Sequence, residues 1–257
     1  KPIYILGISC FYHDSAAVLL KDGQIVFAAQ EERFTRKKQD ESIPINAINK
    51  AFEFEGISIK DIDAVGFYEK PLLKFFDRIL QSYFRVWPFG YVSYLSGMKE
   101  WMNKKLWTSH QLKKELNYDG QLYYSTHHES HAASAFFASG YDDSTIVTVD
   151  GVGEWATATM GYGKNTDIDL SHEVRYPHSL GLLYSAVTYY LGFKVNSAEY
   201  KVMGLAPYGE PKYVDNLREL IDIKEDGSFE LNKKCFTYDR TLRMTGKTFE
   251  KLLGQPR

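Results

Sequence analysis

Two histidines four residues apart stand at the start of a segment with helical character. They are His127 and His131, and the alanine-rich run 132–138 follows them. Residues four apart share one face of an α-helix, with Cβ atoms about 5–6 Å apart. Two neutral imidazoles placed in this way can bind one metal ion. A helix cap or a core position is the other explanation for such a pair.

Asp150 is the third candidate ligand of this metal, because it ends the strand expected over 144–149. A strand end and the start of the preceding helix can meet at one edge of a sheet. The spacing therefore predicts a divalent metal site at His127, His131 and Asp150. Gly151 and Gly153 follow in a polar elbow, where backbone N–H groups can point at an anion. Many ordinary turns also contain Asp-Gly-x-Gly.

His13 lies in an earlier polar elbow, between the strands expected over 4–9 and 16–20. A lone histidine is usually structural, but this position makes His13 a candidate base or substrate clamp. Asp14 could orient the imidazole or cap the turn.

Two further segments carry polar chemistry. The run 31–38 holds four cations within six residues, which could bind phosphate or carbamoyl oxygens or form a solvated face. The segment 197–209 mixes polar residues with glycines and fits either a nucleotide loop or a helix start followed by a turn. The residues are Arg33, Arg36, Lys37 and Lys38 in the first segment, and Glu199, Lys201 and Gly204 in the second.

The elements that must position these residues alternate between strands and helices. The segments 4–9, 16–20 and 25–29 predict an antiparallel meander with an Asp-Gly hairpin turn at 22–23. A helix over 45–54 that ends at Gly56, and a strand over 63–68, follow. Residues 71–117 are rich in aromatic and basic side chains and predict a helical insertion, in which packing is the usual role of an aromatic stripe. A lid or partner surface is the alternative.

A strand, a polar elbow and a second strand occur twice, around residue 9 and around residue 149. Two such units facing each other can hold a polyphosphate and its metal. This pattern resembles the superfamily of actin, sugar kinases and chaperone ATPases. We therefore expect an α/β fold of actin-like (ribonuclease-H-like) lobes with mixed β-sheet. The first lobe would cover 1–140, including the insertion at about 71–117, and the second 141–257.

Composition narrows the class of protein. The chain has 257 residues, 44% of them hydrophobic, and a formal net charge of -2, which argues against disorder and against bulk electrostatic binding of nucleic acid. The two cysteines, 225 positions apart, fit a reducing, cytoplasmic location. No apolar run approaches the roughly 18 residues of a membrane span.

The motifs together resemble the nodulation-type O-carbamoyltransferases, and more distantly the tRNA threonylcarbamoyladenosine-forming enzymes. The matching stretches are 11–17 (FYHDSAA), 31–38 (EERFTRKK), His127 and His131 with Asp150, and 201–209 (KVMGLAPYG). The resemblance covers residues 3–209.

The resemblance implies a two-step reaction. Carbamoyl phosphate and ATP give carbamoyl adenylate in a C-terminal domain, and the carbamoyl group then passes to a substrate hydroxyl in the N-terminal, actin-like domain. It implies that His127, His131 and Asp150 hold a divalent metal, iron, that His13 is needed for transfer, and that Lys38 binds the carbamoyl adenylate. Residues 199–204, with Gly151 and Gly153, would approach the nucleotide.

Members of this family are longer chains, so the second lobe is expected to be incomplete and the adenylate-forming domain missing. The chain alone is then expected to be inactive and to expose apolar surface. Leu217, Leu220, Ile221 and Ile223 stand at near-helical spacing and need a partner. A silent nucleotide- or metal-binding fragment and a sugar kinase are the alternatives. Paired histidines speak against a kinase, because kinases usually hold magnesium with oxygen ligands.

Overall fold

The computed structural model describes residues 1–87, 91–103 and 105–257. They form two compact units. Unit 1 is Lys1–Phe75 with Met98–Ser130, and unit 2 is Phe76–Gly97 with His131–Arg257. This division differs from the expected lobes 1–140 and 141–257, because part of the insertion and most of one later helix belong to unit 2.

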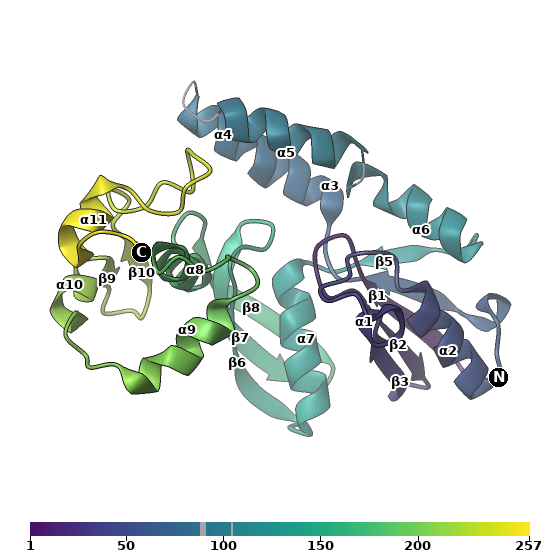
Figure 1. Cartoon of the computed structure of the whole chain (residues 1–257). Coiled ribbons are helices and arrows are strands. Elements are labelled where there is room, and N and C mark those ends of the chain that lie inside the picture. Colours follow the sequence, from purple (N-terminus) through teal and green to yellow (C-terminus); the bar gives the residue numbers. More distant parts are fainter. Residues whose placement is uncertain (88–90, 104) are drawn as a thin grey trace. The chain divides into compact units, whose positions relative to one another are not determined.

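Unit 1 is built on a mixed five-stranded sheet in the order β3-β2-β1-β4-β5 (Figure 1). The strands β1 (Tyr4–Ser9), β2 (Ala16–Lys21) and β3 (Gln24–Gln30) form the expected antiparallel meander. The strands β4 (Ala64–Phe67) and β5 (Leu122–Tyr124) continue the sheet parallel to β1. The Asp22-Gly23 turn has positive φ at both residues, as a tight hairpin requires.

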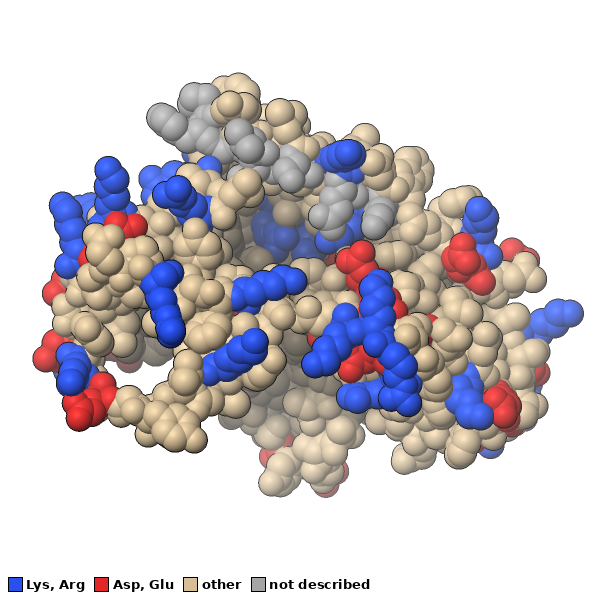
Figure 2. Space-filling model, in the orientation of Figure 1, with Lys and Arg blue, Asp and Glu red and all other residues tan. Residues whose placement is uncertain are grey.

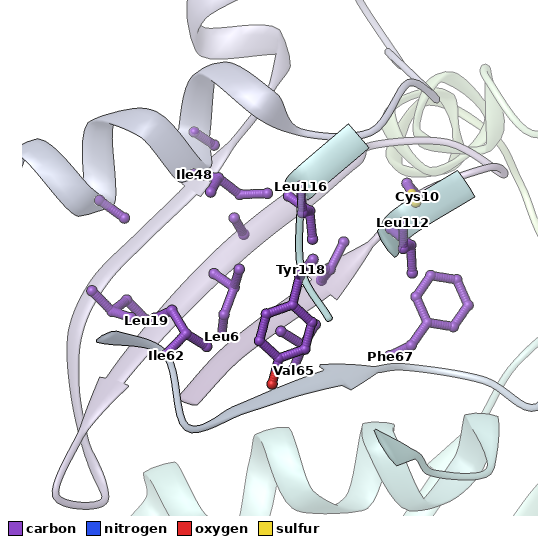
Figure 3. Packing of buried hydrophobic residues seen from close by; sticks show 14 of the residues in the cluster. Leu6, Cys10, Leu19, Ile48, Ile62, Val65, Phe67, Leu112, Leu116 and Tyr118 are labelled. Atoms are coloured by element: carbon purple, nitrogen blue, oxygen red, sulfur yellow. The ribbon is translucent and has the colours of Figure 1, made fainter. Parts of the chain in front are cut away.

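Alternate residues of β1, β2 and β4 are buried, and two helices add further side chains to the unit 1 core (Figure 3). The helix α2 (Ile45–Glu55) contributes Ile48 and ends at Gly56, which has a φ of 67°. The helix α6 (Thr108–Leu116) contributes Leu112 and Leu116. Short turns, α1 (Glu32–Thr35) and η1 (Ile59–Asp61), connect the larger elements.

The expected insertion is helical. It contains α3 (Pro71–Leu73), a π-helix η2 (Lys74–Leu80), α4 (Gln81–Val86), α5 (Tyr91–Asn103) and η3 (Lys105–Trp107) before α6. Residues 88–90 and 104 of this insertion lie outside the described residues. Phe75 and Trp101 are buried, whereas Phe84 is 74% and Trp87 is 68% exposed. Packing thus accounts for only part of the aromatic stripe.

Unit 2 contains an antiparallel sheet of β6 (Asp143–Val149), β7 (Ala156–Lys164) and β8 (Asp167–Arg175). The helix α7 (His127–Ser139) packs Ala132 and Phe136 against Ile146 of β6. Alternate side chains of the sheet are exposed, among them Val147, Val149, Met160 and Tyr162.

A second cluster of unit 2 joins α8 (Leu180–Tyr190), the hairpin β9 (Ile221–Ile223) and β10 (Phe229–Leu231), and α11 (Lys247–Leu253). Three short helices connect α8 to β9 along the chain. They are α9 (Glu199–Leu205), η4 (Ala206–Tyr208) and α10 (Val214–Arg218). The helical spacing expected through 217–223 is wrong, since α10 ends at Arg218 and Ile221 opens a strand. Leu220 is fully buried, while Leu217 and Ile223 are exposed.

Within the described ranges, no helix combines the length and the apolar character needed to cross a bilayer.

Candidate metal centre and the elements that hold it

His127 and His131 lie one turn apart on the single continuous helix α7, and Asp150 directly follows β6. One ligand atom from each of the three residues lies within 4.8 Å of the other two. Nε2 of His131 is 3.7 Å from Oδ2 of Asp150. Two ligand atoms each about 2.1 Å from one metal lie roughly 3–4 Å apart. Small side-chain rotations would therefore let all three bind a single ion, so the residues present fit a divalent metal.

The Asp150 carboxylate raises the pKa of the His131 imidazole, because it stabilises the protonated ring. A metal cation can take the place of that proton, since imidazole binds metals in its neutral form.

The first turn of α7 is fixed by its own polar residues. The backbone N–H of Thr126 donates to Glu129 Oε2 over 2.7 Å, and Glu129 N donates to Thr126 Oγ1 over 3.4 Å. This reciprocal pair is a capping box. The hydroxyl of Ser130 also donates to the carbonyl of Tyr68, beyond the end of β4, over 2.7 Å. These bonds hold the start of the helix at the carboxyl end of a buried strand.

The elbow that follows Asp150 is held by two residues that sequence reasoning missed. Ser179 Oγ donates to the Gly151 carbonyl over 2.7 Å, and Arg78 Nη1 donates to the Gly153 carbonyl over 2.6 Å. Arg78 lies in the insertion at about 71–117, whose aromatic side chains are expected to serve packing. Ser179 lies in a segment without a recognisable motif. No spacing pattern links either residue to the elbow.

The amides of Gly151 and Gly153 are both used inside this elbow. Gly151 N donates to Asp150 Oδ1 over 2.6 Å, and Gly153 N donates to the Ala156 carbonyl over 2.9 Å. Their contact with an anion stays a prediction, and the two amides would have to give up these hydrogen bonds to donate to an anion.

The helix α8 approaches the elbow very closely at Gly181. A Cβ at this position would lie 2.6 Å from the Asp150 carbonyl oxygen and 2.6 Å from Gly151 N. Only a residue without a side chain permits this packing.

His13 lies in the elbow between β1 and β2, and its side chain is 43% exposed, outside the hydrophobic core. Nδ1 of His13 is 2.7 Å from Oδ2 of Asp14. Asp14 thus orients the imidazole, one of the two roles expected for it. Phe11 in the same elbow has a φ of 70°, which is strained for an aromatic residue.

Three backbone bonds of 2.8 Å tie this elbow to the basic segment 31–41. Phe11 N donates to the Glu41 carbonyl, Ser15 N to the Asp40 carbonyl, and Glu31 N to the Ser15 carbonyl. The elbow that carries His13 and the segment that carries Lys38 are therefore one connected structure.

The four cations of the basic segment, Arg33, Arg36, Lys37 and Lys38, are exposed around α1, where Figure 2 shows a group of Lys and Arg side chains. Two buried carboxylates hold the segment at its ends. Glu31 accepts from Asn46 N, Asn46 Nδ2 and Ala47 N at the start of α2. Asp40 accepts from Ser42 and Thr35. Sequence reasoning assigned neither a role, although each flanks the charge run.

The segment predicted to approach the nucleotide is a helix, not a loop. Glu199 stands at the start of α9, and its carboxylate accepts from Asn196 N, Ala198 N and Ser185 Oγ. Burial alone would raise the pKa of the Glu199 carboxyl, but these hydrogen bonds outweigh burial and lower the pKa. Lys201 and Gly204 lie exposed on α9. Of these three residues, Glu199 is engaged in positioning the helix.

Comparison with known proteins identifies sequences that resemble this chain over most of its length. The chain is 52% identical to the uncharacterized protein sll1178 of Synechocystis sp., an alignment that covers 99% of this chain and 43% of the relative. It is 33% identical to the nodulation protein NolNO of Sinorhizobium fredii, over 86% of this chain and 32% of the relative. The uncharacterized protein MJ1051 of Methanocaldococcus jannaschii is 28% identical over 92% of this chain and 39% of the relative.

The chain thus spans about two fifths or less of the length of these relatives. The family model described as "Carbamoyltransferase N-terminus" matches residues 4–257, nearly the whole chain. The chain belongs to the carbamoyltransferase N-terminus family.

Proposed function

We propose that this chain is the N-terminal, acceptor-modifying part of an O-carbamoyltransferase. It would transfer a carbamoyl group from carbamoyl adenylate, made from carbamoyl phosphate and ATP, to a hydroxyl of a small-molecule acceptor. The observation that carries the proposal is the cluster of His127, His131 and Asp150 in a chain that the family model matches over residues 4–257.

The cluster would hold a divalent metal, iron in our proposal, which supplies positive charge to the phosphate oxygens of the adenylate. The capping box at Thr126 and Glu129 supports this role, because it fixes the helix turn that carries His127. Ser179 and Arg78 support it from the other side by holding the backbone after Asp150.

His13 is the proposed base for transfer. With Nδ1 beside the Asp14 carboxylate, Nε2 is left to accept the proton of the attacking hydroxyl. Lys38 would bind the phosphate or carbamoyl oxygens on the same connected structure.

The remaining sequence predictions stand as proposals of different weight. Gly151, Gly153, Lys201 and Gly204 are proposed nucleotide contacts, whereas the three hydrogen bonds of Glu199 support a positioning role for that residue. The repeated antiparallel strand–elbow–strand unit, β1–β2 and β6–β7, supports an actin-like fold. We propose that adenylate formation requires a further domain, since the relatives are more than twice as long as their aligned parts.

Metal content tests the cluster. Purified chain loaded with ferrous iron or zinc should retain about one ion per chain by elemental analysis, and His131→Ala should retain far less. His172→Ala is the matched control, because His172 is an exposed histidine on β8 outside the cluster. Equal metal loss in both variants, or none in His131→Ala, would contradict the proposed site.

Transfer itself is testable in a chimera that joins this chain to the remainder of the Synechocystis relative. His13→Asn should slow carbamoyl transfer to hydroxyl acceptors, screened among simple sugars and polyols, by about 10²–10⁴-fold. Adenylate formation, followed as carbamoyl-phosphate-dependent exchange of pyrophosphate into ATP, should continue. Loss of both steps together would show that His13 serves folding instead.

A further inference from the structure

A small pocket in unit 2 lies outside every site described above. Its volume is about 200 Å³, and it is lined by residues of α4, of the turn after β8 and of the C-terminal segment, among them Ser82, Arg85, Tyr176, Lys233 and Asp239. Pockets for drug-sized ligands measure about 300–1,000 Å³, so this one suits a small ligand.

The pocket carries an excess of positive charge. Neither Arg85 nor Lys233 forms an ion pair with any described residue. The acid in the lining is already engaged, because Asp239 Oδ1 lies 3.1 Å from Arg240 Nε. Two cations beside one neutralised carboxylate favour an anionic ligand.

Arg85 is held in a geometry that suits anion binding. Its guanidinium lies over the Trp155 ring, with Cζ 4.9 Å from the ring centroid. This cation–π contact holds the side chain in place, and the planar N–H fork of a guanidinium matches the oxygens of phosphate and carboxylate groups.

Hydroxyl donors complete the lining. The Ser82 hydroxyl is buried and has no hydrogen-bond partner among the residues that the structure describes. A buried hydroxyl without a partner is costly, so such an atom points to a ligand. Burial, helped by the Asp239 carboxylate, raises the pKa of Tyr176, whose phenol therefore stays protonated and able to donate.

We propose that this pocket binds a small oxyanion, the phosphate or carboxylate group of a low-molecular-weight ligand. Arg85 and Lys233 supply the charge, and the hydroxyls of Ser82 and Tyr176 supply further donors. The pocket borders the elbow that follows Asp150, because Tyr176 N donates to the Trp155 carbonyl over 2.9 Å. The proposal does not depend on carbamoyl transfer.

Isothermal titration calorimetry of the chain with inorganic phosphate, and separately with malonate, tests the proposal at constant ionic strength in chloride. We expect millimolar or tighter binding of at least one anion. Arg85→Gln and Lys233→Gln should each weaken this binding about tenfold, as the loss of a charge-assisted hydrogen bond does. Arg218→Gln is the matched control, because Arg218 is an exposed cation on α10. Binding of phosphate alone would indicate a phosphorylated ligand, and binding of malonate alone a carboxylate.

Ser82→Ala separates binding from folding. It should weaken anion binding while leaving the melting temperature unchanged or higher, because it removes a buried hydroxyl that lacks a partner. Where Arg85→Gln lowers the melting temperature, Lys233→Gln decides the matter, since this side chain is exposed. The proposal is overturned if neither anion binds, or if binding persists unchanged in both charge variants. It is also overturned if Arg218→Gln weakens binding as much as they do.

Discussion

Asp40 and Glu31 show how single buried carboxylates shape the exposed basic segment between them. Asp40 Oδ1 accepts the hydroxyl and the backbone N–H of Ser42, and Oδ2 accepts the Thr35 hydroxyl over 2.8 Å. Glu31 caps the start of α2 in the same way. The four cations can therefore face solvent in a defined backbone without contributing to the core.

Replacement of Asp40 by Ala should destabilise the chain by about 1–3 kcal/mol, because the donors of Ser42 and Thr35 lose their buried acceptor. Urea denaturation followed by circular dichroism measures this loss. Asp215→Ala is the control, since the Asp215 side chain is 93% exposed and the change should cost little. An equal effect of the two substitutions would refute the bracing role of Asp40.

The same carboxylate makes stability depend on pH. The hydroxyl and backbone N–H of Ser42 lower the pKa of Asp40 to about 2 in the folded chain, against about 3.9 in an unfolded chain. A lowered acid pKa contributes stability that is fully present above about 3.9 and is lost as the pH falls toward 2. The difference in unfolding free energy between wild type and Asp40→Asn should therefore be larger at pH 5 than at pH 2.

At the scale of elements, the contact of α8 with the elbow after Asp150 depends on one glycine. Gly181→Ala would place a methyl group 2.6 Å from backbone atoms of Asp150 and Gly151, so the helix or the elbow must shift. We expect lower metal retention and a lower melting temperature. In contrast, Gly204→Ala on α9 meets nothing within 4 Å and should raise stability by about 0.5–1 kcal/mol. A neutral Gly181→Ala would show that this packing is not needed.

Elements with a strong local pattern could be predicted from the sequence. The meander, the helix ending at Gly56 and the helix through His127 all appear, because alternation, Asp-Gly turns and C-terminal glycines are local. The strand β9 is not among the elements that the sequence predicts. Ile221 and Ile223 alternate, and Asp226-Gly227 supplies a hairpin turn, but Leu217 and Leu220 extended the run to a false helical spacing.

The candidate metal cluster was predictable for the same reason, since one helix turn joins His127 to His131 and a strand end supplies Asp150. The two residues that hold the elbow after Asp150, Arg78 and Ser179, could not be predicted in this way. Arg78 is 75 positions from its partner Gly153, and Ser179 is 28 positions from Gly151. Such contacts arise from tertiary packing, which no local spacing encodes.

At the scale of the whole molecule, the exposed apolar side chains of the unit 2 sheet are expected to promote association between copies of the chain. Val147 is 64% and Val149 54% exposed on β6, with Met160 and Tyr162 exposed on β7. Contiguous apolar surface favours association. We expect concentration-dependent light scattering and binding of a hydrophobic dye. Val147→Lys with Met160→Lys should reduce both, whereas Val214→Lys, an exposed apolar position on α10, should not. Unchanged scattering in the double variant would contradict this expectation.

The three backbone bonds between the first elbow and the basic segment have a consequence for amide hydrogen exchange. The N–H groups of Phe11, Ser15 and Glu31 donate to carbonyls that are 16–30 positions away in the sequence, so we expect the three bonds to open together. We expect the three amides to exchange with deuterium at similarly slow rates and to report the same opening free energy, as amides of one cooperative unit do. Phe11 stores backbone strain in that unit. Asp40→Ala should therefore accelerate the exchange of all three amides together, although only the N–H of Ser15 donates to the carbonyl of residue 40.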